Sequence, residues 1–195
     1  LYGVNDTTDG AVTTTLTRAN LGGSSVITSG GQRTLSTGTP PSDSRGWYVD
    51  LPAGERFVGN PTISEGVVYL PTYVPTPGNA GCASSGTNWL FGLQSGTGGG
   101  AFGQSRLDST TGTVISDGVA GLRTDSTGSA AVTDVGINSL PGTGLAAGGT
   151  GGSGTSPPSG APPTPPNECW NYVNNGNQRI FVPYPCGRQS WRQIQ

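Results

Sequence analysis

Two acidic residues beside a turn are the nearest approach to a catalytic arrangement in this sequence. Asp50 and Glu55 flank the turn residues 52–54, and a pair of carboxyl groups at a suitable separation can hydrolyse a glycosidic bond. Acidic residues in such places are more commonly solvated surface groups, and we favour that interpretation. The chain has no histidine, which excludes histidine-based catalytic triads and histidine metal sites.

Three further segments have compositions that also occur in functional loops. Residues 5–10 contain Asp6 and Asp9, but no closing glutamate follows them. We therefore expect a turn rather than a calcium loop. The glycines at 96–100 are followed by no lysine and no expected helix, so they do not predict a phosphate-binding loop. Cys82 has no nearby histidine or lysine to lower its pKa, which argues against a nucleophilic role. We expect no catalytic residue, no cofactor and no metal in this segment, and hence no enzyme.

The composition favours a β protein rich in loops. Of 195 residues, 35 are glycine and 16 are proline, while only 31% are hydrophobic and 10% are charged. Such values are typical of low-complexity chains, but here the apolar residues gather in short runs between turns. All nine basic residues are arginine, the net charge is -2, and no strong basic patch is present for nucleic acid. No apolar run is long enough for a membrane span.

The chain contains three cysteines, which are Cys82, Cys169 and Cys186. Because Cys169 and Cys186 lie in the same short C-terminal unit, we expect them to form a disulfide, which would stabilise that unit by about 3 kcal/mol. The partner of Cys82 stays open, and the alternative is that all three are reduced and buried. The sequence begins without methionine and with a strand-like run, so we expect a processed product or a fragment of a larger protein.

Residues 46–93 are the most strand-like stretch. Short runs of aromatic and β-branched residues alternate with turn residues there, which predicts consecutive antiparallel strands at 46–51, 56–63, 67–74 and 87–93. The last run is bulky on both faces and is expected to be buried between layers. Weaker strands are expected at 114–122 and 130–137, and a helical turn near 16–21. Most aromatic residues of this stretch are expected to pack inside rather than line a groove: Trp47, Tyr48, Tyr69, Tyr73, Trp89 and Phe91.

Composition divides the chain into three parts. Residues 1–145 hold most of the expected strands, 146–166 form a linker rich in glycine, serine and proline, and 167–195 form a C-terminal unit. In that unit two apolar runs flank Asn175 and Gly176, which is a strong hairpin signal. A two-residue turn centred on this pair would place Cys169 opposite Val182, so a disulfide to Cys186 needs a further fold or a bulge.

The block GWYVDLPAGER at 46–56, the strand at 67–75, Cys82 and TNWLFGL at 87–93 stand in an order that resembles the C-terminal region of the PilY family. LYGVND, LTRANL and the closing GRQSWR look like further elements of that family. The resemblance covers about half of the chain. It implies a β-propeller-like fold, of which this chain would hold one blade and parts of its neighbours. The calcium loop of the family is not found in this segment, so any calcium-controlled function would lie in an upstream part of the protein or be absent.

The resemblance implies a non-enzymatic component of the type IV pilus tip, exported through the periplasm to the cell surface. It would act in pilus biogenesis and in adhesion to host or abiotic surfaces. We expect the C-terminal unit to dock on minor pilins, because aromatic and arginine residues dominate binding hot spots. The candidates are Trp170, Tyr172, Phe181, Arg188, Trp191 and Arg192.

Three alternatives stay open from the sequence. In the first, the C-terminal unit folds back and seals the propeller instead of docking on a partner. The whole chain would otherwise be a subunit of a self-assembling surface filament, which a composition rich in glycine and threonine tolerates. An enzyme, either a quinoprotein-like propeller or a glycosidase, is the third reading, but no pattern of cofactor ligands supports it.

Overall fold

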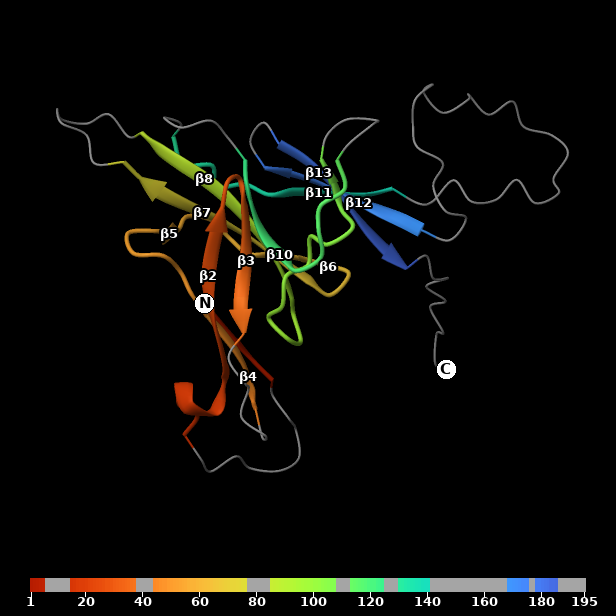
Figure 1. Cartoon of the computed structure of the whole chain (residues 1–195). Coiled ribbons are helices and arrows are strands. Elements are labelled where there is room, and N and C mark those ends of the chain that lie inside the picture. Colours follow the sequence, from red (N-terminus) through yellow and green to blue (C-terminus); the bar gives the residue numbers. More distant parts are fainter. Residues whose placement is uncertain are drawn as a thin grey trace, which may run out of the picture.

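A computed structural model describes residues 1–5, 15–37, 44–76, 85–107, 113–124, 130–140, 168–175 and 178–185. Within these residues the regular secondary structure is all β-strand apart from one short 3-10 helix, η1 (Arg18–Asn20). The strands form two sheets (Figure 1). The predicted fold class, all-β with antiparallel sheets and a propeller-like region, is confirmed.

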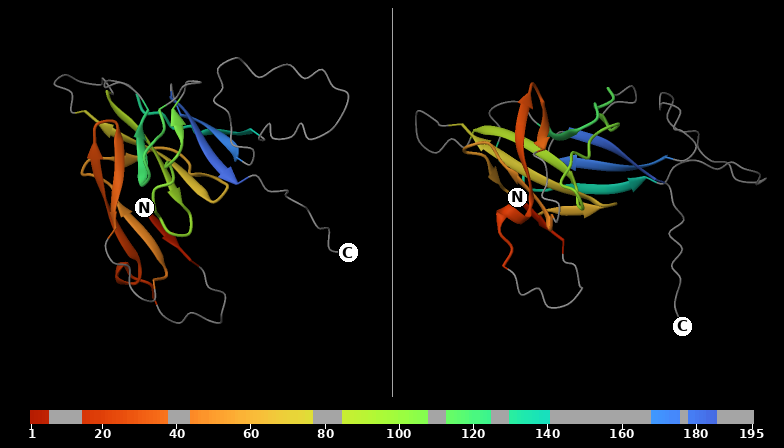
Figure 2. Two further views of the ribbon diagram at one scale, coloured as in Figure 1. Left: turned by 45° about the vertical axis from the view of Figure 1, so that its right-hand side comes forward. Right: turned by 60° about the horizontal axis from the view of Figure 1, so that its bottom comes forward.

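The larger sheet has nine strands in the described part of the chain and curls into a half-barrel (Figure 2). Its order is β1-β4-β2-β3-β10-β8-β7-β5, and β6 also pairs with β7. Of these pairings, β2 with β4 is parallel and the others are antiparallel. The strands are β1 (Tyr2–Val4), β2 (Gly22–Ser29), β3 (Gln32–Thr37), β4 (Gly46–Asp50), β5 (Arg56–Phe57), β6 (Thr62–Ser64), β7 (Val67–Pro75), β8 (Gly86–Gln94) and β10 (Val119–Arg123).

The smaller sheet is antiparallel and has the order β11-β12-β13-β9 among the described strands. Its strands are β9 (Arg106–Leu107), β11 (Gly136–Leu140), β12 (Glu168–Asn175) and β13 (Gln178–Pro185). β12 and β13 are the predicted hairpin, but Asn175 pairs with Gln178, so the turn lies one residue later than expected. Cys169 therefore lies opposite Tyr184 and not opposite Val182. Gly-Asn, which follows Asn175 in the sequence, is also a hairpin-turn dipeptide, and this is why the pattern left the register ambiguous.

β8 separates two cores, because its alternate side chains point to opposite faces of the larger sheet. Leu90 faces a core that also contains Tyr69, Phe102 and residues of the smaller sheet. Phe91 and Leu93 face the concave side of the half-barrel. Leu90, Phe91 and Leu93 are all 0% exposed, so the expectation that this strand is buried on both faces is confirmed.

The strand pairing around residues 46–93 differs from the prediction. β4 pairs with β1 and β2, not with the strand that follows it. The sequence pattern does not predict β2 and β3 as full strands, because their serine, threonine and glycine residues show little apolar alternation. The run at 56–63 is split into the short edge strands β5 and β6, with Pro61 between them. Proline cannot donate a ladder hydrogen bond, which confines it to such edges.

The hairpin shares a core with the larger sheet. Val173, Ile180 and Val182 belong to the same apolar cluster as Tyr69 and Leu90. Buried polar contacts add to this attachment: Asn175 accepts a hydrogen bond from Thr124 Oγ1 at 3.0 Å and donates one to the Asp134 carbonyl at 2.9 Å. Residues 168–175 and 178–185 thus fold back onto the body of the protein, as one of the two readings of this unit expected. The linker at 146–166 lies outside the described residues.

Candidate functional site

The two acidic residues singled out in the sequence serve separate ion pairs. Asp50 is exposed and pairs with Arg18 across 2.6 Å. Glu55 is buried, and its Oε1 lies 2.5 Å from Nη1 of Arg33. The prediction that Glu55 is a solvated turn residue is wrong. It failed because its partner stands 22 residues earlier in the chain, where local sequence context cannot show it.

Arg33 and Glu55 form a polar clasp on the concave side of the half-barrel. Arg33 comes from β3, while Glu55 precedes β5, so the pair spans the strands between them. Thr72 on β7 donates a hydrogen bond to Glu55 Oε1. The guanidinium carbon of Arg33 lies 3.7 Å from the centre of the Trp89 ring. At this distance the arginine cation and the ring make a stabilising cation–π interaction. Arg33 Nε and Glu55 Oε2 have no hydrogen-bond partner in the described part of the chain.

Trp47 makes a second connection across the same concave side. Its ring lies where side chains of Gly3 and Gly98 would stand, since a Cβ at either glycine would come within 2.4 Å of it. Its Nε1 donates a hydrogen bond to the Ser95 carbonyl at 2.8 Å, just beyond β8. The block at 46–56 therefore contributes both Trp47 and Glu55 to the closure of the half-barrel.

The remaining aromatic residues behave largely as expected. Trp47, Tyr69, Tyr73, Trp89 and Phe91 are buried. Tyr48 is half-buried, and the Arg18 guanidinium stacks on its ring at 4.1 Å. The expectation that most of these rings pack inside is confirmed. The segment 96–100 forms a turn that accommodates Trp47. Cys82 and residues 6–10 lie outside the described residues.

The predicted partner-binding residues of the hairpin lie on one face of the smaller sheet. Cys169, Asn171, Val173 and Asn175 alternate along β12 as buried residues, so Trp170 and Tyr172 point to the opposite face. Phe181 on β13 lies opposite Tyr172, and their ring centres are 5.3 Å apart. Pro183 lies opposite Trp170. We call Trp170, Tyr172, Phe181 and Pro183, all half-buried, the outer hairpin face.

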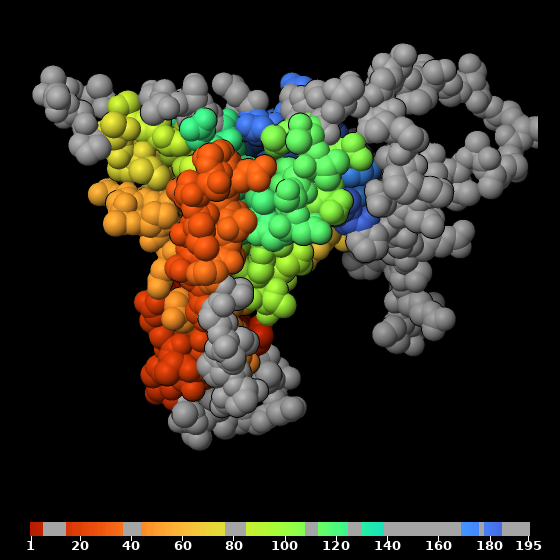
Figure 3. Space-filling view, in the orientation of Figure 1, coloured from red at the N-terminus to blue at the C-terminus, as the bar shows by residue number. Residues whose placement is uncertain are grey.

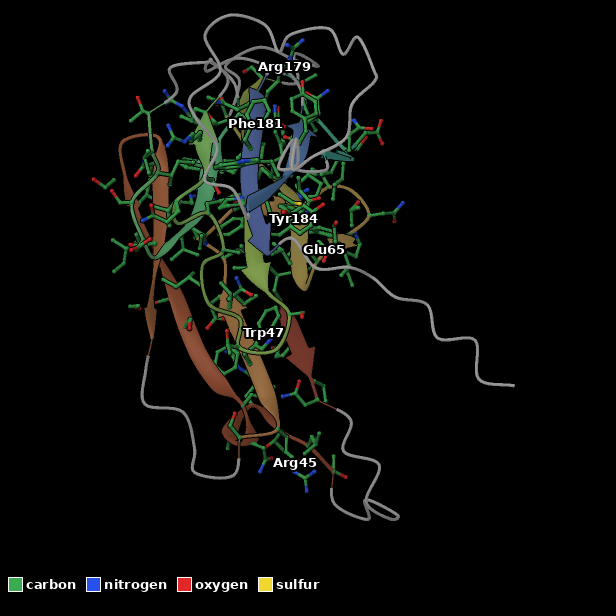
Figure 4. The ribbon with its side chains drawn as sticks, turned by 90° about the vertical axis from the view of Figure 1, so that its right-hand side faces the viewer. Arg45, Trp47, Glu65, Arg179, Phe181 and Tyr184 are labelled. Atoms are coloured by element: carbon green, nitrogen blue, oxygen red, sulfur yellow. The ribbon has the colours of Figure 1, made fainter. Side chains whose placement is uncertain are left out.

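Arginine residues border the outer hairpin face. Arg179 is exposed on β13, two residues before Phe181, and Figure 4 shows both along the same strand. Arg106 on β9 lies beside Phe181 in the register. Neither arginine was among the sequence candidates. In the case of Arg106, only strand pairing brings β9 next to β13. The indole N–H of Trp170 is shielded from solvent and has no hydrogen-bond partner among the described residues.

Several predictions about the C-terminal unit are not tested. Arg188, Trp191 and Arg192 lie outside the described residues, as does Cys186. Cys169 is buried and lies on the core side of β12, and its disulfide with Cys186 stays a prediction. In the described ranges no three histidine, cysteine or acidic residues gather as metal ligands. Over the same ranges, no helix has the length and apolar character to cross a membrane.

The fold and the surface just described define a two-sheet β module without a recognisable catalytic centre in its described part. No family model matches the chain, and no solved structure matches it. Over 166 residues it is 35% identical to the type IV pilus biogenesis factor PilY1 homolog of Xylella fastidiosa, a match that covers 77% of this chain and 11% of that protein. The chain belongs to the PilY family, in keeping with a C-terminal region of such a protein.

Proposed function

We propose that this chain is a non-enzymatic part of the type IV pilus tip that acts in pilus biogenesis and surface adhesion. The name of its relative, a type IV pilus biogenesis factor, supports the general assignment. The observation that carries the finer proposal is the outer hairpin face, whose aromatic residues share one surface. Export through the periplasm and exposure at the cell surface are part of the proposal, and no cofactor is needed in this segment.

The outer hairpin face is the surface we assign to minor pilins. Tyrosine, tryptophan and arginine are enriched in the few residues that dominate binding energy, and here Tyr172 and Phe181 are held in contact. Arg179 and Arg106 border them, which favours a pilin surface with an acidic rim. Arg188, Trp191 and Arg192 are proposed to extend the contact beyond β13.

The test is recovery of minor pilins with the purified chain. Removing residues 167–195 would also remove Val173, Ile180 and Val182 from the core, so a loss of binding would not distinguish docking from unfolding. The double variant Tyr172→Ala, Phe181→Ala changes the outer hairpin face only. We expect it to lower pilin recovery by at least about tenfold.

The matched control is Phe57→Ala, which removes a ring that is 40% exposed on β5. This variant should leave pilin recovery unchanged. Equal recovery with the wild-type chain and the folded double variant would contradict docking through this face. The disulfide is tested separately, because peptide mapping without reductant should recover Cys169 linked to Cys186; a peptide linking Cys169 to Cys82, or a free Cys169 thiol, would contradict it.

A further inference from the structure

β1 closes one end of the larger sheet and has a free edge in the described part of the chain. It pairs with β4, and no other described strand borders it. Leu1 exchanges two hydrogen bonds with Val49, at 3.0 and 2.9 Å, and the Asn5 N–H donates to the Arg45 carbonyl at 2.8 Å. Backbone groups alternate in direction along a strand. The N–H and C=O groups of Tyr2 and Val4 therefore point away from β4.

The two ends of the sheet differ in how they are protected. At the far end, β5 has only two residues, carries Arg56 and is bordered by Pro52 and Pro61. Short length, charge and proline are the usual means by which proteins prevent pairing at a sheet edge. β1 carries no charged side chain and no proline, and Tyr2 and Val4 are 59% and 56% exposed. Among the described residues its edge is thus open both in backbone and in side chains.

β1 is self-complementary. Two antiparallel copies centred on Gly3 would place Tyr2 opposite Val4 of the second copy, and their free backbone groups would face each other in a hydrogen-bonded pair. The two Gly3 residues would then form the central, non-hydrogen-bonded pair, where strands approach most closely. The Trp47 ring already occupies the place of a Gly3 side chain, within 2.3 Å of where a Cβ would stand. A second glycine opposite it needs no further room.

We propose that two copies of this chain associate through antiparallel pairing of β1 with β1 about a twofold axis. The pairing joins the two large sheets into one continuous sheet. The Tyr2 and Tyr48 rings pack together, with their centres 6.0 Å apart. Tyr2 therefore supplies a fixed apolar surface for Val4 of the second copy. β1 carries no charged side chain, so self-pairing places no like-charged side chains directly opposite each other.

This contact is isologous and closes at two copies, so it makes a dimer and not a filament. A strand of three residues buries far less surface than the roughly 1,200–2,000 Å² of a stable interface. The association is therefore weak, with a dissociation constant between about 10 μM and 1 mM. It is independent of the outer hairpin face, which lies on the smaller sheet.

Sedimentation equilibrium over a range of concentrations tests the proposal. We expect the wild-type chain to dimerise and Val4→Lys to weaken the association constant by at least about tenfold, since lysine at an edge opposes pairing. Ile63→Lys is the matched control, because it adds the same charge at a residue that is 67% exposed on β6. That variant should associate as the wild type does.

Tyr2→Lys should weaken association as Val4→Lys does, and it replaces that variant if Val4→Lys does not fold. Circular dichroism confirms that each variant is folded. A wild-type chain that stays monomeric up to about 1 mM would overturn the proposal. So would equal weakening by Val4→Lys and Ile63→Lys, because that result would indicate nonspecific apolar contact.

Discussion

At the scale of single residues, a buried ion pair between Arg33 and Glu55 connects distant parts of the larger sheet. Arg33 is 3% exposed and Glu55 is 9% exposed, and each is tied to the other and to neighbours of different strands. Removing one member of a buried ion pair leaves the other charge without compensation, which is more costly than removing both. The pair thus restricts how β3 and the segment before β5 can be placed.

The first prediction concerns this pair. We expect Glu55→Ala to lower the free energy of unfolding by about 3–5 kcal/mol, because it leaves the Arg33 charge buried and unpaired. The double variant Arg33→Met, Glu55→Leu should recover a large part of that loss. Urea unfolding measures both effects. Asp50→Asn, at the exposed pair with Arg18, is the control and should change the unfolding midpoint much less; an equally small effect of Glu55→Ala would contradict the buried clasp.

Tyr69 predicts how stability depends on alkaline pH. Burial raises the pKa of its phenol well above the ordinary value, and its hydroxyl has no hydrogen-bond partner in the described structure. The unfolded chain ionises this group near pH 10, roughly the ordinary pKa of tyrosine, while the folded chain keeps it protonated. The unfolded state therefore gains stability as the pH rises above that value, and the protein loses it.

We expect Tyr69→Phe to reduce the loss of stability above about pH 10, and to cost little at neutral pH because an unpaired buried hydroxyl is removed. Thermal unfolding of both proteins across this pH range provides the measurement. Tyr2→Phe is a suitable control, since Tyr2 is 59% exposed. Identical alkaline profiles for wild type and Tyr69→Phe would show that burial of this phenol is not the cause.

At the scale of elements, the hairpin and the half-barrel stabilise each other. β12 and β13 present their apolar residues to the core that β7, β8 and β10 also line. Neither sheet buries that core alone. The same placement turns Tyr172 and Phe181, both half-buried, away from this core. Attachment to the body and the outer hairpin face are therefore two consequences of one strand alternation.

This arrangement predicts a single cooperative unfolding transition. Ile180→Ala removes side-chain volume from a residue that is 0% exposed, and we expect it to lower the free energy of unfolding by about 2–5 kcal/mol. The hairpin and the half-barrel should still unfold together, as followed by near-UV and far-UV circular dichroism. Ile63→Ala is the exposed control and should have little effect. Two separate transitions would indicate that the hairpin is an independent unit.

At the scale of the whole molecule, two candidate surfaces lie apart. The views agree that the N-terminal strands and the hairpin occupy different parts of the molecule (Figures 1 and 2). In the space-filling view the red and orange N-terminal strands form one arm, and the blue hairpin lies at another side (Figure 3). Figure 4 likewise places Arg45 and Trp47, which flank the start of β4, well away from Phe181 and Arg179.

This separation predicts that the two surfaces act independently, because effects at distant sites are usually additive. Val4→Lys should leave recovery of minor pilins unchanged, and the double variant Tyr172→Ala, Phe181→Ala should leave self-association unchanged. Pilin recovery and sedimentation of all three proteins test this. If Val4→Lys also reduced pilin recovery, the two surfaces would be parts of one interface.

The sequence alone determined the features that depend on neighbouring residues. The apolar runs of β7 and β8 and the aromatic burial at Trp47 and Trp89 followed from residue types, and so did the existence of the hairpin. The block at 46–56 also indicated the family, because its order of residues resembles that of the PilY family. Such features are local, and side-chain period and turn chemistry specify them.

Only the tertiary structure decided which strands lie together. β4 lies between β1 and β2, and Glu55 finds Arg33 across several strands. β9, only two residues long, meets β13 and brings Arg106 beside the outer hairpin face. Pairing between strands far apart in the sequence depends on how the apolar faces of the sheets pack in the core. β2 and β3 have too little apolar alternation for their pairing to be predicted from the sequence. Local sequence therefore specified the strands with clear apolar runs, such as β7 and β8, while packing in the two cores specified the strand partners and the surfaces.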